Sequence, residues 1–320
     1  MTNDHNEAGL SEVIGFILLL ALLVSALSVW MVYVVPINGR EEEIAQMNIV
    51  KDQFTNYKFT LDALRTNIAM DNLSPVMTST SFTLGTGGGN TQAGGVFLAM
   101  LKPIASYGTL SIQDTGDQFN IDSSNYHGSA GAKGEFPINI TSLQYSSNNH
   151  YWIQQQYVYD MGGVFLYQDT SATTRISPLI SIANTANNSL VVNVVPVNLV
   201  GGGSIAGNGP VRVDTRQRIL PKYNISQDYY LNNQWVNLTV STSNNATAAV
   251  WQNVFTDIVT REQIGSSAYT ISSQWNPTSR RTNVTIYITG SNPTAPWDVA
   301  LYVQRAEFYV TFNNIAQGLT

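Results

Sequence analysis

The run VIGFILLLALLVSALSVWMVYVV, residues 13–35, decides the architecture of this 320-residue chain because it contains no charged side chain. As an α-helix it would extend about 35 Å, enough to cross a hydrocarbon core about 30 Å thick. Trp30 and Tyr33 lie near its end, where amphipathic rings prefer the membrane interface. The alternative, a buried helix of a soluble protein, is disfavoured by the length and all-round apolarity. The sequence therefore predicts a transmembrane helix in contact with membrane lipid.

The flanks of this run distinguish a retained anchor from a cleaved secretory signal. A secretory signal has a basic start, an apolar stretch of about 7–15 residues and a small-residue cleavage site. Here the preceding residues, MTNDHNEAG, are acidic, and the following VVPINGREEE offers no such site. We therefore expect the helix to be retained. Neither flank is rich in Lys or Arg, so the positive-inside rule gives no orientation.

The composition of the whole chain narrows its function class. Only 11% of its residues are charged, against about 25% in typical domains. Asn, Ser, Thr and Gly take their place, and the aromatic content argues against disorder. No run of Lys or Arg could neutralise phosphates, which excludes nucleic acid as an expected partner. The absence of cysteine excludes disulfides, thiolate metal sites and cysteine nucleophiles.

A short polar leader followed by Gly9, Leu10, Ser11, Glu12 and an unbroken apolar helix resembles an archaeal type IV pilin precursor. The run Gly-Leu-Ser-Glu-Val-Ile-Gly-Phe, residues 9–16, carries the resemblance, which is specific only over residues 1–35. It implies a class III signal peptide that a prepilin-type peptidase cuts between Gly9 and Leu10 on the cytoplasmic side. It also implies a single-pass cell-membrane protein with an extracellular C-terminal domain. Copies of itself or other pilin-like subunits would be its partners in a surface filament.

Glu12 has two readings. The bacterial pattern of this family places a Glu five residues after the cut, where it can pair with a neighbour's N-terminal ammonium, whereas Glu12 lies two residues closer. The other reading is a helix-start acid that the helix macrodipole favours.

A second helical pattern begins at Arg40, after Pro36 and Gly39 predict a kink or pause. Its apolar residues are spaced three and four apart, as in a heptad seam: Met47, Val50, Phe54, Tyr57, Leu61, Leu64 and Ile68. Two interpretations stay open. In the first, the seam contacts neighbouring subunits, chiefly through Met47, Val50, Phe54 and Tyr57. In the second, the seam packs on the protein's own head. Under the first, Met47 and Val50 should remain exposed on an isolated subunit.

Beyond residue 75 the pattern becomes strand-like. Alternating or β-branched runs are separated by turn signals at 78–84, 95–101, 109–113, 138–145, 151–159, 164–167, 190–199, 235–241, 282–289 and 299–312. One helix is predicted over 247–263, with Asn244, Asn245 and Thr247 as candidate N-caps. The fold class is therefore α+β: a long N-terminal transmembrane and stem helix, then a β-sandwich-like head with one additional helix. The expected units are a leader (1–9), a transmembrane and stem helix (10–73) and an extracytoplasmic head (74–320) that folds without the stem.

No motif predicts an active site, a cofactor or a metal. Asp114-Thr115-Gly116 matches the aspartic-protease tripeptide but lacks the second copy that this chemistry requires, so a turn is the ordinary reading. Asp114, Asp117 and Asp122 could converge on calcium, although the EF-hand spacing is absent. The three histidines show no metal-ligand spacing. An enzyme is therefore not expected.

Seven N-x-S/T sequons suggest a surface glycoprotein, although roughly five or six would arise by chance in so Asn-rich a chain. The candidate acceptors are Asn72, Asn139, Asn187, Asn224, Asn237, Asn245 and Asn283.

The leading functional prediction is a pilin-like filament subunit, and the size of the head favours a minor or tip-located one. The alternative is an anchored surface protein that does not assemble and serves adhesion or envelope structure.

Overall fold

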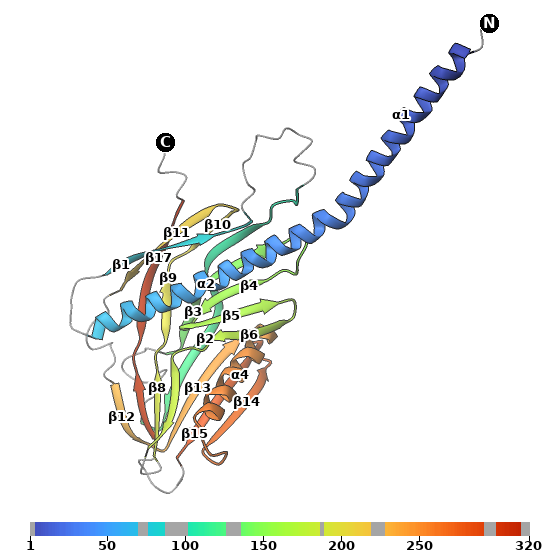
Figure 1. The fold of residues 1–320 in the computed structure, drawn as a ribbon. Coiled ribbons are helices and arrows are strands. Elements are labelled where there is room, and N and C mark those ends of the chain that lie inside the picture. Colours follow the sequence, from blue (N-terminus) through green and yellow to red (C-terminus); the bar gives the residue numbers. More distant parts are fainter. Residues whose placement is uncertain are drawn as a thin grey trace.

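The computed structural model describes residues 4–69, 76–86, 102–125, 136–185, 189–218, 228–290 and 299–314. Over these residues a single long N-terminal helix leads into a strand-rich domain with curled sheets and one further helix (Figure 1). The predicted α+β class is confirmed at this level.

The long helix is continuous through the predicted kink or pause. It consists of α1 (Asp4–Val29), a π-helical turn η1 (Trp30–Val34) and α2 (Val35–Ala69). Pro36 has no N–H and would clash with the carbonyl four residues earlier in a regular α-helix. The wider π turn lies directly before it, with the Val35 N–H bonded to the Trp30 carbonyl oxygen. Pro36 therefore coincides with a bend rather than an end of the helix, and Figure 1 shows α2 lying across the head while α1 projects from it.

Three sheets form the described part of the head. The nine-stranded sheet is ordered β14 (Tyr269–Asn276), β15 (Arg281–Thr289), β13 (Trp235–Thr242), β2 (Tyr107–Ser123), β3 (Ile138–Asn148), β4 (Gln156–Asp160), β5 (Gly163–Gln168) and β6 (Ser171–Ile176), with β10 (Gly203–Gly207) also on β2. One four-stranded sheet is ordered β1 (Met77–Thr83), β11 (Pro210–Gln217), β17 (Ala306–Asn314) and β9 (Val197–Val200). The other is β12 (Asp228–Asn233), β16 (Val299–Val303), β8 (Leu190–Val194) and β7 (Ile180–Asn184).

The long strand β2 has one irregularity that lets it serve both halves of the nine-stranded sheet. Its register with β3 shifts between Asp114 and Gln118, so that extra residues bulge out of the ladder. Before the bulge β2 pairs with β10, and after it with β13. A bulge bends a strand and increases its twist, which accounts for the curl of the sheet.

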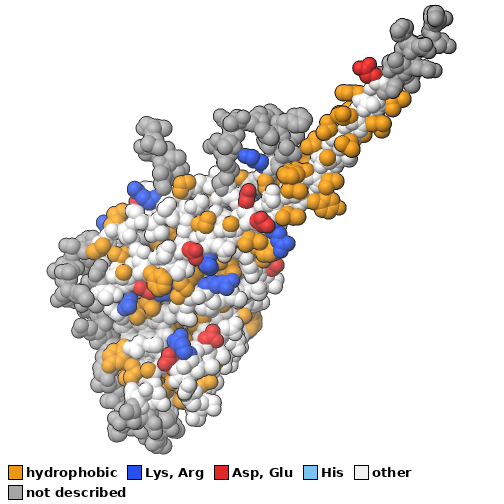
Figure 2. Space-filling model, in the orientation of Figure 1, with side chains coloured by type: hydrophobic (Ala, Val, Ile, Leu, Met, Phe, Trp, Pro, Cys, Tyr) orange, Lys and Arg blue, Asp and Glu red, His pale blue; other side chains and the backbone are white. Residues whose placement is uncertain are grey.

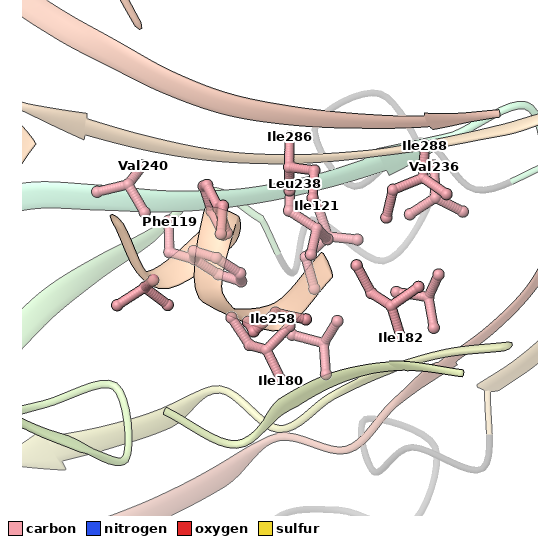
Figure 3. Close-up of a cluster of buried hydrophobic side chains, with 14 of the residues drawn as sticks. Phe119, Ile121, Ile180, Ile182, Val236, Leu238, Val240, Ile258, Ile286 and Ile288 are labelled. Carbon is pink, nitrogen blue, oxygen red and sulfur yellow. The ribbon is translucent and has the colours of Figure 1, made fainter. Parts of the chain in front are cut away.

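The helix α4 (Asn245–Arg261) covers the first hydrophobic core. Asn244 caps it, because its side-chain oxygen accepts hydrogen bonds from the N–H groups of Ala246 and Thr247. Figure 3 shows Ile121, Leu238 and Ile286 reaching from β2, β13 and β15 toward Ile258 of α4, with Ile180 and Ile182 of β7 on the same side as the helix. Alternation along β13 and β15 therefore buries one face of this part of the nine-stranded sheet in the first core.

The second hydrophobic core contains α2. Phe54, Tyr57 and Leu61 pack with residues of β1, β3, β4, β11 and β17. The ring of Tyr57 lies edge-on to those of Phe82 and Tyr159, with centroids 5.8 and 5.5 Å away. A boundary at residues 73/74 would separate parts of one core, so the expectation that the head folds without the stem is revised.

Candidate functional site

The apolar helix is the feature of this molecule that most restricts which functions are possible for it. The large apolar side chains from Val13 to Tyr33 are 38–68% exposed, and none of the most apolar window is buried inside the molecule. Figure 2 shows these side chains covering the projecting helix, whereas the visible face of the head is mainly uncharged and polar. The helix is long and apolar enough to span a membrane once, which agrees with the predicted anchor.

Two hydroxyl groups inside the apolar run are satisfied locally. Ser25 Oγ donates to the Leu22 carbonyl oxygen and Ser28 Oγ to the Val24 carbonyl oxygen, both at 2.8 Å. Such bonds leave no hydroxyl that requires water. This stretch of the helix is therefore compatible with hydrocarbon around it.

The predicted processing site lies within helical backbone. Gly9 and Leu10 fall inside α1, and their side chains lie outside the described residues. Glu12 is the first described side chain and is exposed. Both readings of Glu12, an ammonium partner and a helix-start acid, stay predictions.

The junction between helix and head is held by the carboxylate of Glu43, which is 1% exposed. Its Oε1 accepts a hydrogen bond from the backbone N–H of His150 at 2.6 Å, and its Oε2 one from the N–H of Tyr151 at 2.9 Å. These N–H groups belong to the connection between β3 and β4. Charge-assisted hydrogen bonds of this kind are roughly twice as strong as neutral ones. The carboxylate therefore fixes this loop onto the first part of α2.

Close packing reinforces the same junction. A Cβ atom added to Gly39 would lie 2.3 Å from Cδ2 of the Tyr151 ring, closer than any side chain could tolerate. The Arg40 guanidinium lies 4.4 Å from the centre of the Trp152 ring, within the range of a cation–π interaction. Gly39 was predicted to lie at a kink or pause and Arg40 to begin a helix, and neither prediction includes these contacts, since no local pattern identifies a partner 107 residues away.

The prediction of an assembly seam at Met47, Val50, Phe54 and Tyr57 is wrong for the isolated subunit. Met47 is 4% exposed and the other three are fully buried in the head. Tyr57 Oη is hydrogen-bonded to Thr215 Oγ1 at 3.1 Å. The seam is therefore internal core, the second of the two interpretations above. Sequence spacing gives the apolar face of a helix but not what covers it.

The outer face of α2 carries apolar side chains instead. Ile49 is 46% exposed and Phe59 is 58% exposed. Ile37 of α2, which is 56% exposed, and the exposed residues of α1 and η1 are further described apolar positions on the helix that a second molecule could reach.

The three aspartates considered for calcium do not form a site. Asp114 lies in a local turn, where its Oδ1 accepts from the Gly116 N–H at 2.8 Å and Gly116 has a φ of 75°. Asp122 lies farther along β2, opposite Asn237 of β13. No group of three His, Cys, Asp or Glu side chains that could hold a metal occurs among the described residues.

Asp117 instead approaches Asp160, a residue that the sequence analysis did not single out. Both are buried, and Asp160 Oδ1 has no hydrogen-bond partner. Burial, with a smaller contribution from the charge of Asp117, raises the pKa of Asp160 to about 8. Burial also raises the pKa of Asp117, against the hydrogen bond from Thr242. The pair is a titratable element inside the head rather than an accessible catalytic dyad.

The candidate glycosylation sites divide by their surroundings. Asn139 and Asn245 are exposed, the latter at the start of α4. Asn237 and Asn283 are half-buried on the adjacent strands β13 and β15. The remaining sites, Asn72, Asn187 and Asn224, lie outside the described residues.

Comparisons with protein-family models, curated proteins and solved structures found no match to this chain.

Proposed function

We propose that this protein is a membrane-anchored, pilin-like structural subunit of an archaeal type IV pilus-like surface filament, with its head outside the cell. In this proposal a prepilin-type peptidase cuts between Gly9 and Leu10, and the helix anchors the subunit before assembly. The exposed apolar helix is the observation that carries the proposal. A helix of this kind must be covered by lipid or by the helices of other subunits.

The head is suited to a structural rather than a chemical role. We class it as sandwich-like, because the nine-stranded sheet shares one core with each four-stranded sheet. Its size favours a minor or tip-located subunit.

Filament contacts in this proposal involve a different surface from the heptad seam. The side chains of α1 and the outer face of α2, with Ile49 and Phe59, are free to meet neighbouring helices. The seam residues stabilise the subunit itself.

A surface protein that does not assemble is the second candidate, and the burial of the seam favours it. If α2 serves only to hold the head, the apolar helix needs no partner besides lipid. Adhesion or envelope structure would then be its role.

Adjacent substitutions on α2 test assembly separately from folding. Ile49→Glu places a charge on an exposed position, whereas Val50→Glu places one in the core. Val50→Glu should destabilise the subunit by several kcal/mol. Ile49→Glu should leave its melting temperature unchanged and reduce the amount sedimenting as filaments from native cells.

If the Ile49→Glu variant and a parallel Phe59→Glu variant both form normal filaments, the outer face of α2 does not contact neighbouring subunits. Protein found only in the membrane fraction, with no filaments even for the wild type, would favour the anchored surface protein. Protein found only in the soluble fraction would contradict both candidates.

A further inference from the structure

A group of apolar and aromatic side chains surrounds the junction between helix and head. Ile104, Tyr107, Trp152 and Ile153, called the rim here, come from the segment before and at the start of β2 and from the β3–β4 connection. Ile104 is 64% exposed, Tyr107 45% and Ile153 42%. Exposed apolar side chains gathered around one position indicate an interaction surface.

The ring of Tyr151 ties the rim to the helix, and contacts within the head hold the rim residues in place. The ring of Tyr151 lies against Gly39, and its Oη accepts a hydrogen bond from the Ile104 N–H at 3.2 Å. The Ile153 carbonyl oxygen accepts from Asn149 Nδ2 at 2.9 Å, and Tyr107 pairs with Asn148 in the sheet. The rim therefore cannot move away from the helix without breaking the junction.

The height of the rim along the helix follows from helix geometry. Gly39 lies four residues beyond the end of the apolar run at residue 35, which is about 6 Å along the axis. The polar region of a bilayer is roughly 5–8 Å thick on each side of the hydrocarbon core. When the apolar run fills the core, Tyr151 lies at the level of the lipid headgroups.

We propose that the rim lies in the interfacial layer of the same bilayer that the helix crosses and holds the head against the membrane surface. This inference rests on the membrane anchoring in the proposed function. Its occupant is lipid, because Tyr and Trp side chains beside the end of a membrane span prefer this layer, and the exposed Ile side chains are stabilised by leaving water.

The charges near the rim define the kind of lipid contact. Glu41 and Glu42 are exposed beside Arg40, and Lys102 lies two residues before Ile104. With the buried Glu43, three acids stand beside these two bases, so the contact relies on apolar burial rather than on attraction to anionic lipid. It should therefore form on a purely zwitterionic bilayer and resist added salt.

The absence of cysteine permits a direct test on the full chain. Single variants Ile104→Cys and Ile153→Cys would carry a nitroxide label in nanodiscs of phosphatidylcholine. Leu22→Cys, in the middle of the apolar run and 68% exposed, marks the hydrocarbon, and Trp275→Cys on β14, at 57% exposure, marks water. Relaxation by oxygen and by a nickel chelate reports the lipid and water accessibility of each label.

Labels at residues 104 and 153 should be at least about threefold less accessible to the chelate than the label at residue 275, at low and at high salt. Equal accessibility of either rim label and the label at residue 275 would overturn the proposal. A water-accessible label at residue 22 would instead contradict the membrane span itself, so the two failures are distinguishable. Unchanged melting temperatures would verify that each labelled protein is folded.

Discussion

The Oε2 atom of Glu43 accepts a hydrogen bond from the backbone N–H of Tyr151 at 2.9 Å, which joins the start of α2 to a loop of the head. This bond lies eight residues beyond the apolar run. The contact therefore fixes the position of the head relative to the anchor as part of the folded structure. Because α2 is also part of the core, anchor and head form one mechanical unit.

Loss of this carboxylate should weaken the junction. Glu43→Ala removes the acceptor of two N–H groups in a buried setting, and we expect a loss of about 1.5–3 kcal/mol in the free energy of unfolding. Glu43→Gln keeps one acceptor oxygen and should lose about half as much. Thermal unfolding of the full chain in detergent micelles measures both.

The matched control is Glu42→Ala, because Glu42 is the exposed neighbour. It should change the stability by less than about 0.5 kcal/mol. Equal effects of the substitutions at residues 42 and 43 would show that the junction does not depend on the buried carboxylate.

Truncation should define the true boundary of the folded head. A chain beginning at residue 36 keeps α2 and should be soluble and rich in β-structure by circular dichroism. A chain beginning at residue 74 lacks Phe54, Tyr57 and Leu61 and leaves the second core open. It should aggregate or unfold well below the melting temperature of the longer fragment, and a stable, monomeric short fragment would refute the role of α2 in the core.

The buried Asp160 should make the free energy of unfolding decrease as the pH rises, which is the opposite of the usual effect of a carboxyl group. Its folded pKa of about 8 lies above the ordinary value of 3.8, so the folded state keeps a proton that the unfolded state releases. Its contribution is fully present below pH 3.8 and is lost as the pH rises through about 8. Asp160→Asn cannot ionise. Relative to the wild type, this variant should gain at least about 1 kcal/mol between pH 4 and pH 8.

Asp257→Asn, on the exposed side of α4, supplies the comparison. Its difference from the wild type should be the same at both pH values. A pH-independent difference for Asp160→Asn as well would show that the buried carboxyl is not titrating in this range.

The parts of the fold that were predictable follow a local periodicity. The apolar run, the heptad seam and the strands alternating at residues 138–145, 235–241 and 282–289 all lie in the expected elements. The helix α4 with its Asn244 cap also follows from local sequence. Each of these features is determined by residues close together in the sequence, within a few helical turns or within one strand.

Other features depended on distant partners. Strands β6, β7, β10, β11, β12 and β14 were missed, and pairing with neighbouring strands defines all six. Much of the sequence of β6, β7 and β14 is Ser, Thr and Asn. The predicted strand over 151–159 begins only at Gln156, because residues 149–155 connect β3 to β4. The predicted strand over 190–199 is interrupted between β8 and β9, and the one over 299–312 between β16 and β17. The predicted strand at 95–101 lies outside the described residues. The hydrogen bonds of Glu43 and the proximity of Asp117 to Asp160 are likewise tertiary contacts, which the local sequence does not predict.

The mass of the N-terminal peptide of the native protein shows whether the chain carries a retained pilin-like anchor. We expect a mature chain beginning at Leu10, recovered from the membrane or filament fraction, and a Gly9→Val variant that stays uncut. A chain beginning at Met1 or Thr2 would contradict the pilin assignment and leave a plain signal anchor. A chain beginning after residue 35 would contradict the anchor altogether.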